Sequence, residues 1–76
     1  MTSIEVKLTF EKGLIKTPTI YELTQKYDLI SNIIKANVEE NMGWVILELV
    51  GPSETIDQGL SWVADQGIII EVVEVV

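Results

Sequence analysis

The chain opens with a strict alternation of apolar and polar positions between Ser3 and Phe10. Every second position is apolar, namely Ile4, Val6, Leu8 and Phe10. An alternation of period two is typical of a β-strand with one buried face. A break follows at Glu11, Lys12 and Gly13. We expect Leu14 and Ile15 to lie in a connection at the edge of the core.

Apolar positions three and four residues apart then predict a helix that ends near Asp28. The positions on its apolar face are Ile20, Leu23 and Tyr27. Two starting points are compatible with the sequence. In one, Thr17 precedes Pro18 at the first helical position, which suits proline. In the other, Thr19 is the N-cap and Glu22, three residues later, completes a capping box.

Two further strands, over 29–38 and 44–50, flank a polar turn over 39–43. The first is apolar on both faces. The second has a cleaner apolar face, formed by Val45, Leu47 and Leu49. The turn contains Asn41 and Gly43, residue types that tolerate a positive φ. A short turn of this kind predicts that the two strands form an antiparallel hairpin.

A second helix is predicted between Ser53, a suitable N-cap, and Gly67, which suits the C-terminal cap. Glu54 and Asp57 place negative charge in its first turn, where the helix dipole favours it. Its predicted buried stripe consists of Ile56, Leu60, Val63 and Ala64. The residues over 68–75 are rich in β-branched side chains and predict a fourth strand.

The order of predicted elements is therefore β-α-β-β-α-β. Right-handed crossovers of this kind give an α+β fold, the ferredoxin-like two-layer sandwich. Its four-stranded antiparallel sheet carries two helices on one face. Because 76 residues suffice for one modest core, we expect residues 1–76 to form a single domain.

A two-layer fold leaves one face of its sheet uncovered. The helices are expected to cover Ile4, Val6, Leu8, Val45, Leu47, Leu49, Ile68, Ile70 and Val72. The apolar residues left on the other face are Trp44, Ile46, Ile69 and Val73, with Glu5, Lys7, Glu48 and Glu71 among them. An apolar patch with a charged rim is typical of an interaction surface. Scattered exposed aliphatic residues are the alternative. We favour association, because a dimer would also compensate for a small core.

Charge and composition narrow the possible partners. The chain has 12 acidic residues, five lysines and no arginine, which gives a net charge of −7. Nucleic acids and anionic membrane surfaces are therefore unfavourable partners. The first residues lack the basic and apolar regions of a signal peptide, and no apolar run is long enough to span a membrane. We expect a cytoplasmic protein.

No chemical motif indicates catalysis. The absence of cysteine and histidine excludes disulfides, iron–sulfur ligation and the commonest general base. Phosphate-binding loops and nucleophile elbows are also absent. Glu39, Glu40 and Asn41 lack the spacing of an EF-hand and are better explained as an acidic turn. We therefore predict neither enzymatic activity nor a metal or cofactor.

Three segments carry a resemblance to a known family. The sequence Ser31-Asn32-Ile33-Ile34, the segment from Gly43 to Gly51 and the closing segment over 64–72 resemble the NIL domain. Members of that family form the C-terminal domain of the ATPase subunit of methionine-importing ABC transporters. There the domain resembles amino-acid-sensing ACT domains, dimerises, binds methionine and inhibits import. Related domains are fused to ferredoxin-type iron–sulfur modules or stand alone, particularly in cyanobacteria.

The resemblance implies a regulatory homodimer that binds methionine or a related amino acid. Asn32 matches the asparagine at the family's effector site, and Ile33 and Ile34 would form apolar walls for the ligand. A side-chain amide complements both the carboxylate and the ammonium of an amino acid. The alternative is that Asn32 is a polar edge-strand residue that satisfies backbone groups. The hairpin loop is shorter than in the transporter domains and keeps one glycine, Gly43.

Two functions therefore remain open. The first is sensing of a small amino acid. We expect a stand-alone domain without an ATPase, so the signal would be passed to a separate protein. The second is a ligand-free interaction module that docks on a ferredoxin-like or transporter partner through the face of Trp44 and Ile46.

Overall fold

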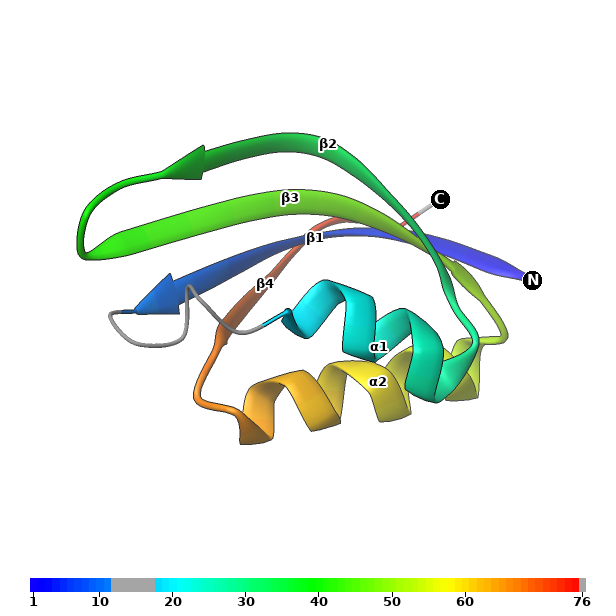
Figure 1. Cartoon of the computed structure of the whole chain (residues 1–76). Coiled ribbons are helices and arrows are strands. Elements are labelled where there is room, and N and C mark those ends of the chain that lie inside the picture. Colours follow the sequence, from blue (N-terminus) through cyan, green and yellow to red (C-terminus); the bar gives the residue numbers. More distant parts are fainter. Residues whose placement is uncertain (12–17, 76) are drawn as a thin grey trace.

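The computed structural model describes residues 1–11 and 18–75. Its elements follow in the order β1 (Thr2–Glu11), α1 (Thr19–Tyr27), β2 (Ile30–Val38), β3 (Met42–Gly51), α2 (Ser53–Asp65) and β4 (Ile69–Val75). The strands form one antiparallel sheet in the order β2-β3-β1-β4. Both helices lie on the same side of this sheet (Figure 1). The predicted ferredoxin-like sandwich is confirmed. Leu14, Ile15 and Thr17 lie outside the described residues.

The core lies between the two helices and the central strands β1 and β3. The buried apolar residues are Val6, Leu8, Leu23, Leu29, Val45, Leu47, Leu49, Ile56, Val63 and Ile68. The helices approach each other closely at Gly59 of α2, because a Cβ there would lie 2.9 Å from Leu23 Cδ1. Ala64, predicted in the buried stripe, is exposed, since it follows Val63 and turns away from the sheet.

The helix ends differ in part from the predictions. α1 begins at Thr19 and α2 at Ser53, each preceded by a proline at the cap position with no side-chain cap hydrogen bond. Neither the Thr19 capping box nor the Ser53 cap is therefore formed. The predicted ends are confirmed: Asp28 follows α1 with a left-handed backbone, and Gly67 follows α2 with φ 88°.

The hairpin turn needs no left-handed residue. Neither Asn41 nor Gly43 has a positive φ, contrary to the expected use of these residues. Gly43 instead lies within β3, opposite Phe10 of β1 and Val38 of β2. The Glu39 N–H donates to the Met42 carbonyl at 2.7 Å and closes the turn.

Irregularities in both edge strands decide which residues share a face. We name the side covered by the helices the helix face and the opposite side the open face. In β2 the pairing skips Ile34, and in β4 it skips Val73. Val72, just before the second skip, lies opposite Val6 on the helix face, yet its side chain is 57% exposed. The expectation that the helices cover Val72 is therefore wrong, because β4 is an edge strand.

The described part of the chain contains no helix with the length and apolar character needed to cross a membrane.

Candidate functional site

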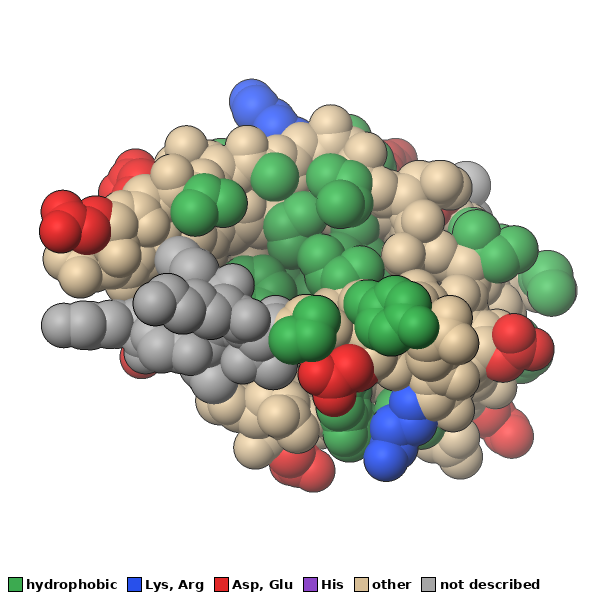
Figure 2. Space-filling view, viewed as in Figure 1, with side chains coloured by type: hydrophobic (Ala, Val, Ile, Leu, Met, Phe, Trp, Pro, Cys, Tyr) green, Lys and Arg blue, Asp and Glu red, His purple; other side chains and the backbone are tan. Residues whose placement is uncertain are grey.

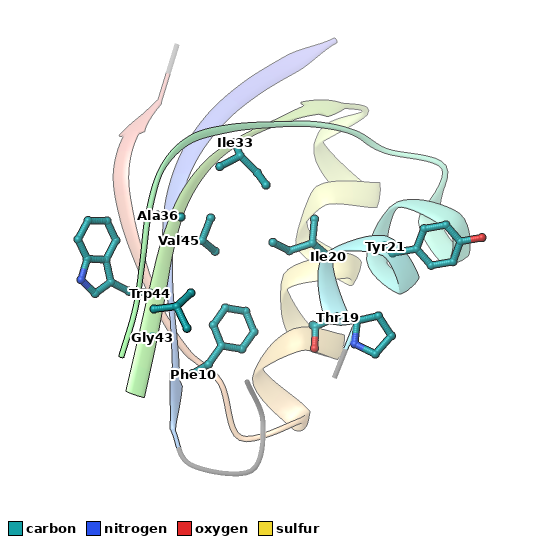
Figure 3. Close-up of a pocket in the computed structure, with 11 residues that line it drawn as sticks. Phe10, Thr19, Ile20, Tyr21, Ile33, Ala36, Gly43, Trp44 and Val45 are labelled. Carbon is teal, nitrogen blue, oxygen red and sulfur yellow. The ribbon is translucent and has the colours of Figure 1, made fainter. Parts of the chain in front are cut away.

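The helix face holds an apolar pocket between α1 and the β2–β3 hairpin. Its volume is about 260 Å³. The lining residues are Phe10, Pro18, Thr19, Ile20, Tyr21, Ile33, Ala36, Val38, Gly43, Trp44 and Val45. Figure 2 shows hydrophobic side chains gathered in a hollow between β2 and α1. In Figure 3, Ile33 and Val45 from the sheet and Ile20 from the helix point into one space.

The pocket exists because α1 does not reach over the outer strand. Ile33 is 62% exposed and Val38 is 74% exposed, although both lie on the helix face. Gly43 adds to the hollow, since it leaves a position of the β3 helix face without a side chain. The result is a concave surface with apolar walls, the usual shape of a small-molecule site.

The start of α1 supplies the polar groups at one edge of the pocket. The Glu22 N–H is bonded to the Pro18 carbonyl at 3.0 Å. The three preceding amides, of residues 19–21, therefore come before the first intrahelical bond. Residues 19–21 line the pocket, and Thr19 itself is only 2% exposed. Amides in the first turn of a helix have no intrahelical partner and favour a negatively charged group.

The open face carries a hydrogen-bonded cluster around Glu48 of β3. Asn32 Nδ2 donates to Glu48 Oε1 at 3.3 Å, and Ser3 Oγ donates to Glu48 Oε2 at 2.9 Å. Glu48 lies opposite Asn32 on one side and opposite Glu5 on the other. These contacts hold the carboxylate of Glu48 in place on a surface that no helix covers.

Three glutamates stand side by side on neighbouring strands of the open face. Glu5 of β1 lies opposite both Glu48 of β3 and Glu74 of β4. The pKa of Glu5 is raised above the ordinary glutamate value, chiefly by a side-chain hydrogen bond with Glu74. Desolvation and the negative charges of Glu74 and Glu48 raise the pKa of Glu5 further. We name Glu5, Glu48 and Glu74 the acidic row.

The apolar residues predicted for the open face are mostly there. Trp44 and Ile69 lie opposite Thr9 from its two sides, and Ile46 lies opposite Lys7. The Lys7 ammonium sits over the Trp44 ring, 5.1 Å from its centroid. In Figure 3 the Trp44 indole lies on the far side of the sheet from Ile20 and Phe10. Val73 is 53% exposed at the skipped position of β4.

A shallow hollow on the helix layer is lined by Tyr27, Asp57, Gln58, Ser61, Trp62 and Asp65. The Tyr27 and Trp62 rings are tilted, with centroids 6.2 Å apart. The Lys26 ammonium lies 5.8 Å from the Trp62 centroid. The Trp62 ring in this hollow is therefore already in contact with a cation of the same chain.

The side chains of Asn32, Ile33 and Ile34 do not share one face of the sheet. Asn32 pairs with Glu48 on the open face, Ile33 pairs with Leu47 on the helix face, and Ile34 is skipped in the pairing. Only Ile33 lines the pocket. The ligand-binding role of all three stays a prediction, and any single ligand would have to bind on one side of β2 or around its edge.

Two features of the candidate site were not predicted from the sequence: the pocket and the acidic row. The pocket depends on how far α1 reaches over β2, and no local pattern encodes that distance. The place of Glu74 in the acidic row depends on the skipped Val73, since Glu71 and Glu74 would otherwise face opposite sides. The sequence signal that could have indicated the acidic row is the pair of glutamates, Glu71 and Glu74, three residues apart in one strand. Among the described residues, no group of three acidic side chains is arranged to hold a metal ion.

Comparison with known families gives one match, which covers most of the chain. The NIL domain model matches residues 5–72. The chain belongs to the NIL domain family. This agrees with the resemblance seen in the sequence. The NIL motif itself lies on β2, at the strand that separates the pocket from the Asn32–Glu48 contact.

Two curated relatives are methionine import ATP-binding proteins named MetN. The protein from Coxiella burnetii is 28% identical over 71 residues, which cover 88% of this chain and 20% of that protein. The protein from Helicobacter hepaticus is 26% identical over 69 residues, which cover 86% of this chain and 20% of that protein. The match thus spans about a fifth of the length of these relatives.

Solved structures confirm the fold. The C-terminal domain of an ABC transporter ATP-binding protein from Enterococcus faecalis has a TM-score of 0.78 at 22% identity, covering 92% of this chain and 82% of that one. The de novo designed protein Foldit4 has a TM-score of 0.63 at 10% identity, covering 99% and 94%. Since a designed protein shares the fold, the fold by itself assigns no function.

Proposed function

We propose that this NIL domain is a non-catalytic regulatory domain that binds a small amino acid with an apolar side chain. Methionine is the first candidate, because the curated relatives are named for methionine import. The observation that carries the proposal is the apolar pocket between α1 and the β2–β3 hairpin. The bound or free state of this pocket would then be passed to a separate protein.

The pocket suits such a ligand in size and polarity. Sites for drug-sized molecules measure roughly 300–1,000 Å³, so a volume of about 260 Å³ suits a smaller one. Ile20, Ile33 and Val45 would surround the thioether or a similar apolar chain. The first amides of α1 would meet the ligand's carboxylate at the edge of the pocket.

Asn32 offers a second position for the polar end of the ligand. Its amide is already bonded to Glu48, and together the two groups provide a donor for a carboxylate and an acceptor for an ammonium. This pair lies on the open face, however, whereas the concave apolar surface is on the helix face. We therefore place the ligand in the pocket and use Asn32 as the test of the alternative.

Calorimetric titration with methionine tests the function, with serine as a polar control. We expect binding of methionine that is weakened by Ala36→Leu, which narrows the pocket, and retained in Asn32→Ala. Loss of binding in Asn32→Ala alone would move the ligand to the open face. No heat with either amino acid up to about 1 mM, where binding is worth about 4 kcal/mol, would contradict amino-acid sensing.

We also propose that the domain is a homodimer that pairs along the outer edge of β2. This edge strand exposes Ile30, Ile33, Ile34 and Val38, each more than half accessible. An edge strand presents unpaired backbone groups that can pair with another strand. Light scattering should give twice the mass of one chain, and Ile34→Lys should reduce it to the monomer mass. A monomeric wild-type protein would contradict the proposal.

A second candidate function is an interaction module that acts without a ligand. The residues that would carry it are Trp44, Ile46, Ile69 and Val73. The observation in its favour is that Trp44, Ile46 and Ile69 share an uncovered sheet face, with Val73 exposed at the skipped position beside it. The Trp44 indole is held by Lys7 and is only partly buried. Such a module would keep its partner when the pocket is filled by mutation.

A further inference from the structure

The acidic row is a local conflict in the fold. Like charges directly opposite each other on neighbouring strands destabilise a sheet. Glu5 nevertheless faces Glu48 on one side and Glu74 on the other. Positions where a sequence breaks a local rule without a gain in folding are often functional.

Among the residues that the structure describes, the negative charge of the row is only partly offset. Asn32 and Ser3 satisfy Glu48 with neutral donors, which fix its position but leave its charge. Glu5 lies opposite both Glu48 and Glu74, and the proximity of these carboxylates raises the pKa of Glu5, as expected for like charges on neighbouring strands. The ammonium of Lys7, in the neighbouring row, is placed over Trp44 instead.

The same face ends in an apolar patch. Trp44 lies four residues before Glu48 on β3, so the two rows are about 13 Å apart at roughly 3.3 Å per residue. Ile69 shares the row of Trp44, and Ile46 lies between the two rows. The open face therefore presents the apolar groups of one row about 13 Å from the carboxylates of the acidic row, with Ile30 and Val50 in the row beyond the carboxylates.

We propose that the open face docks a protein segment that carries apolar side chains at one end and lysines or arginines at the other, about 13 Å apart. This inference rests on the second function proposed above and names the chemistry of its partner. Charge complementarity selects this occupant, since the exposed carboxylates attract basic groups and repel nucleic acids. The apolar end distinguishes a protein segment from a small cation.

A second copy of the chain does not fit this face. In the register, the open face carries the carboxylates of Glu5, Glu48, Glu71 and Glu74 against the lysines Lys7 and Lys35. Two such faces brought together would repel each other. The homodimer proposed above uses the β2 edge, so the open face stays available to a partner.

The test uses two labelled helical peptides and fluorescence anisotropy with the full chain. One peptide carries leucines at one end of a face and lysines at the other, and the second replaces the lysines by glutamines. The acidic-row variant is Glu5→Gln with Glu48→Gln and Glu74→Gln. The matched control is Glu22→Gln with Glu54→Gln and Asp57→Asn, which changes the net charge equally at exposed positions of the helices.

We expect the leucine–lysine peptide to bind, and the acidic-row variant to weaken binding by about tenfold or more, because three exposed charge pairs are lost. The helix control should bind almost as the wild type does, and Trp44→Ser should weaken binding. The acidic-row variant should remain folded in thermal unfolding, because removal of facing like charges relieves repulsion.

Four results would overturn the inference. Equal losses in the acidic-row variant and the helix control would mean that net charge alone attracts the peptide. Tight binding of the glutamine peptide that depends on Trp44 would mean that the face docks a partner, but without the basic groups. Displacement of the peptide by low concentrations of Ca²⁺ or spermine would mean that the acidic row binds small cations. No binding of either peptide would contradict the interaction module itself.

Discussion

The two faces of the sheet are built from the same strands but differ in kind. On β3, the helix face has Val45, Leu47 and Leu49, all buried. The open face of the same strand has Trp44, Ile46 and Glu48, all partly exposed. The helix face is apolar and includes a pocket whose lining, as far as residues 1–11 and 18–75 form it, has no charged side chain. The open face combines aromatic, aliphatic and charged groups.

Under the two functions proposed above, one strand would serve two kinds of recognition. A small apolar ligand needs concave apolar walls, which the pocket on the helix face provides. A partner protein needs a broad surface with charges that set orientation, which only the open face provides. The strand β2 contributes to both, because Ile33 lines the pocket while Asn32 binds Glu48.

The largest expected effect contrasts two neighbours on β3. Leu47 is fully buried on the helix face, so Leu47→Ala should lower the free energy of unfolding by about 2–5 kcal/mol. Ile46 is only partly buried on the open face, so Ile46→Ala should lower it by about 1 kcal/mol. Urea unfolding measures both. Equal losses would mean that the open face is packed as a second core, for example by a partner copy.

The next prediction concerns Gly43, where one substitution should change stability and ligand binding in opposite directions. Gly43 does not need a positive φ, so a β-branched residue fits its backbone. Gly43→Val should fill part of the pocket and raise the free energy of unfolding by about 0.5–1 kcal/mol. It should also weaken methionine binding in calorimetry. Thr9→Val, on the open face, is the matched control and should leave methionine binding unchanged.

A lower stability of Gly43→Val with unchanged methionine binding would contradict the pocket as the ligand site. A higher stability with unchanged binding would place the ligand elsewhere while confirming that the pocket is an incompletely filled part of the core.

The contrast between the faces was largely predictable, and the limits of prediction lie at the edges of the sheet. Strict alternation assigned Val6, Leu8 and Leu47 to one face and Trp44 to the other, because the side-chain period of a strand is two. That rule fails where pairing skips a residue. The skips at Ile34 and Val73 arise from how edge strands fit their single neighbour, which a sequence does not show locally.

The same cause explains what could be predicted of the candidate site. Asn32, Ile33 and Ile34 were found through a family motif, which gives positions in the chain but no register. Consecutive residues of a strand point to opposite faces, so the side chains of Asn32 and Ile33 necessarily lie on opposite sides of the sheet. The pocket and the full acidic row needed the register of β2 and β4, as well as the length of α1.

The pH dependence of stability should distinguish the open face from the helix face. The pKa of Glu5 is raised in the folded state, so the folded state binds its proton more tightly than the unfolded chain. The stabilising contribution is complete below the ordinary glutamate pKa and is lost as the pH rises through the raised value. Acidification from pH 7 towards 5 should therefore increase the melting temperature through this group.

Glu5→Gln should flatten this part of the pH profile and raise the melting temperature at pH 7, because it removes the charge that faces Glu48 and Glu74. Glu54→Gln, at the exposed first turn of α2, serves as the control and should keep the wild-type profile. An unchanged profile in Glu5→Gln would show that another group controls the response to acid.

The smallest expected change in stability concerns two lysines, each of which lies over a tryptophan ring. Lys7→Met and Lys26→Met should each lower the free energy of unfolding by about 0.5–1 kcal/mol, since each removes one exposed cation–aromatic contact. Only Lys7 lies beside the acidic row, opposite Glu71 and two residues from Glu5. Its removal should therefore also raise the repulsion among the carboxylates and increase the stability gained between pH 7 and 5.

Urea unfolding of both variants at the two pH values measures the difference. If the two variants respond equally to pH, the acidic row does not sense the charge of Lys7, and the open face behaves as separate contacts rather than as one charged surface.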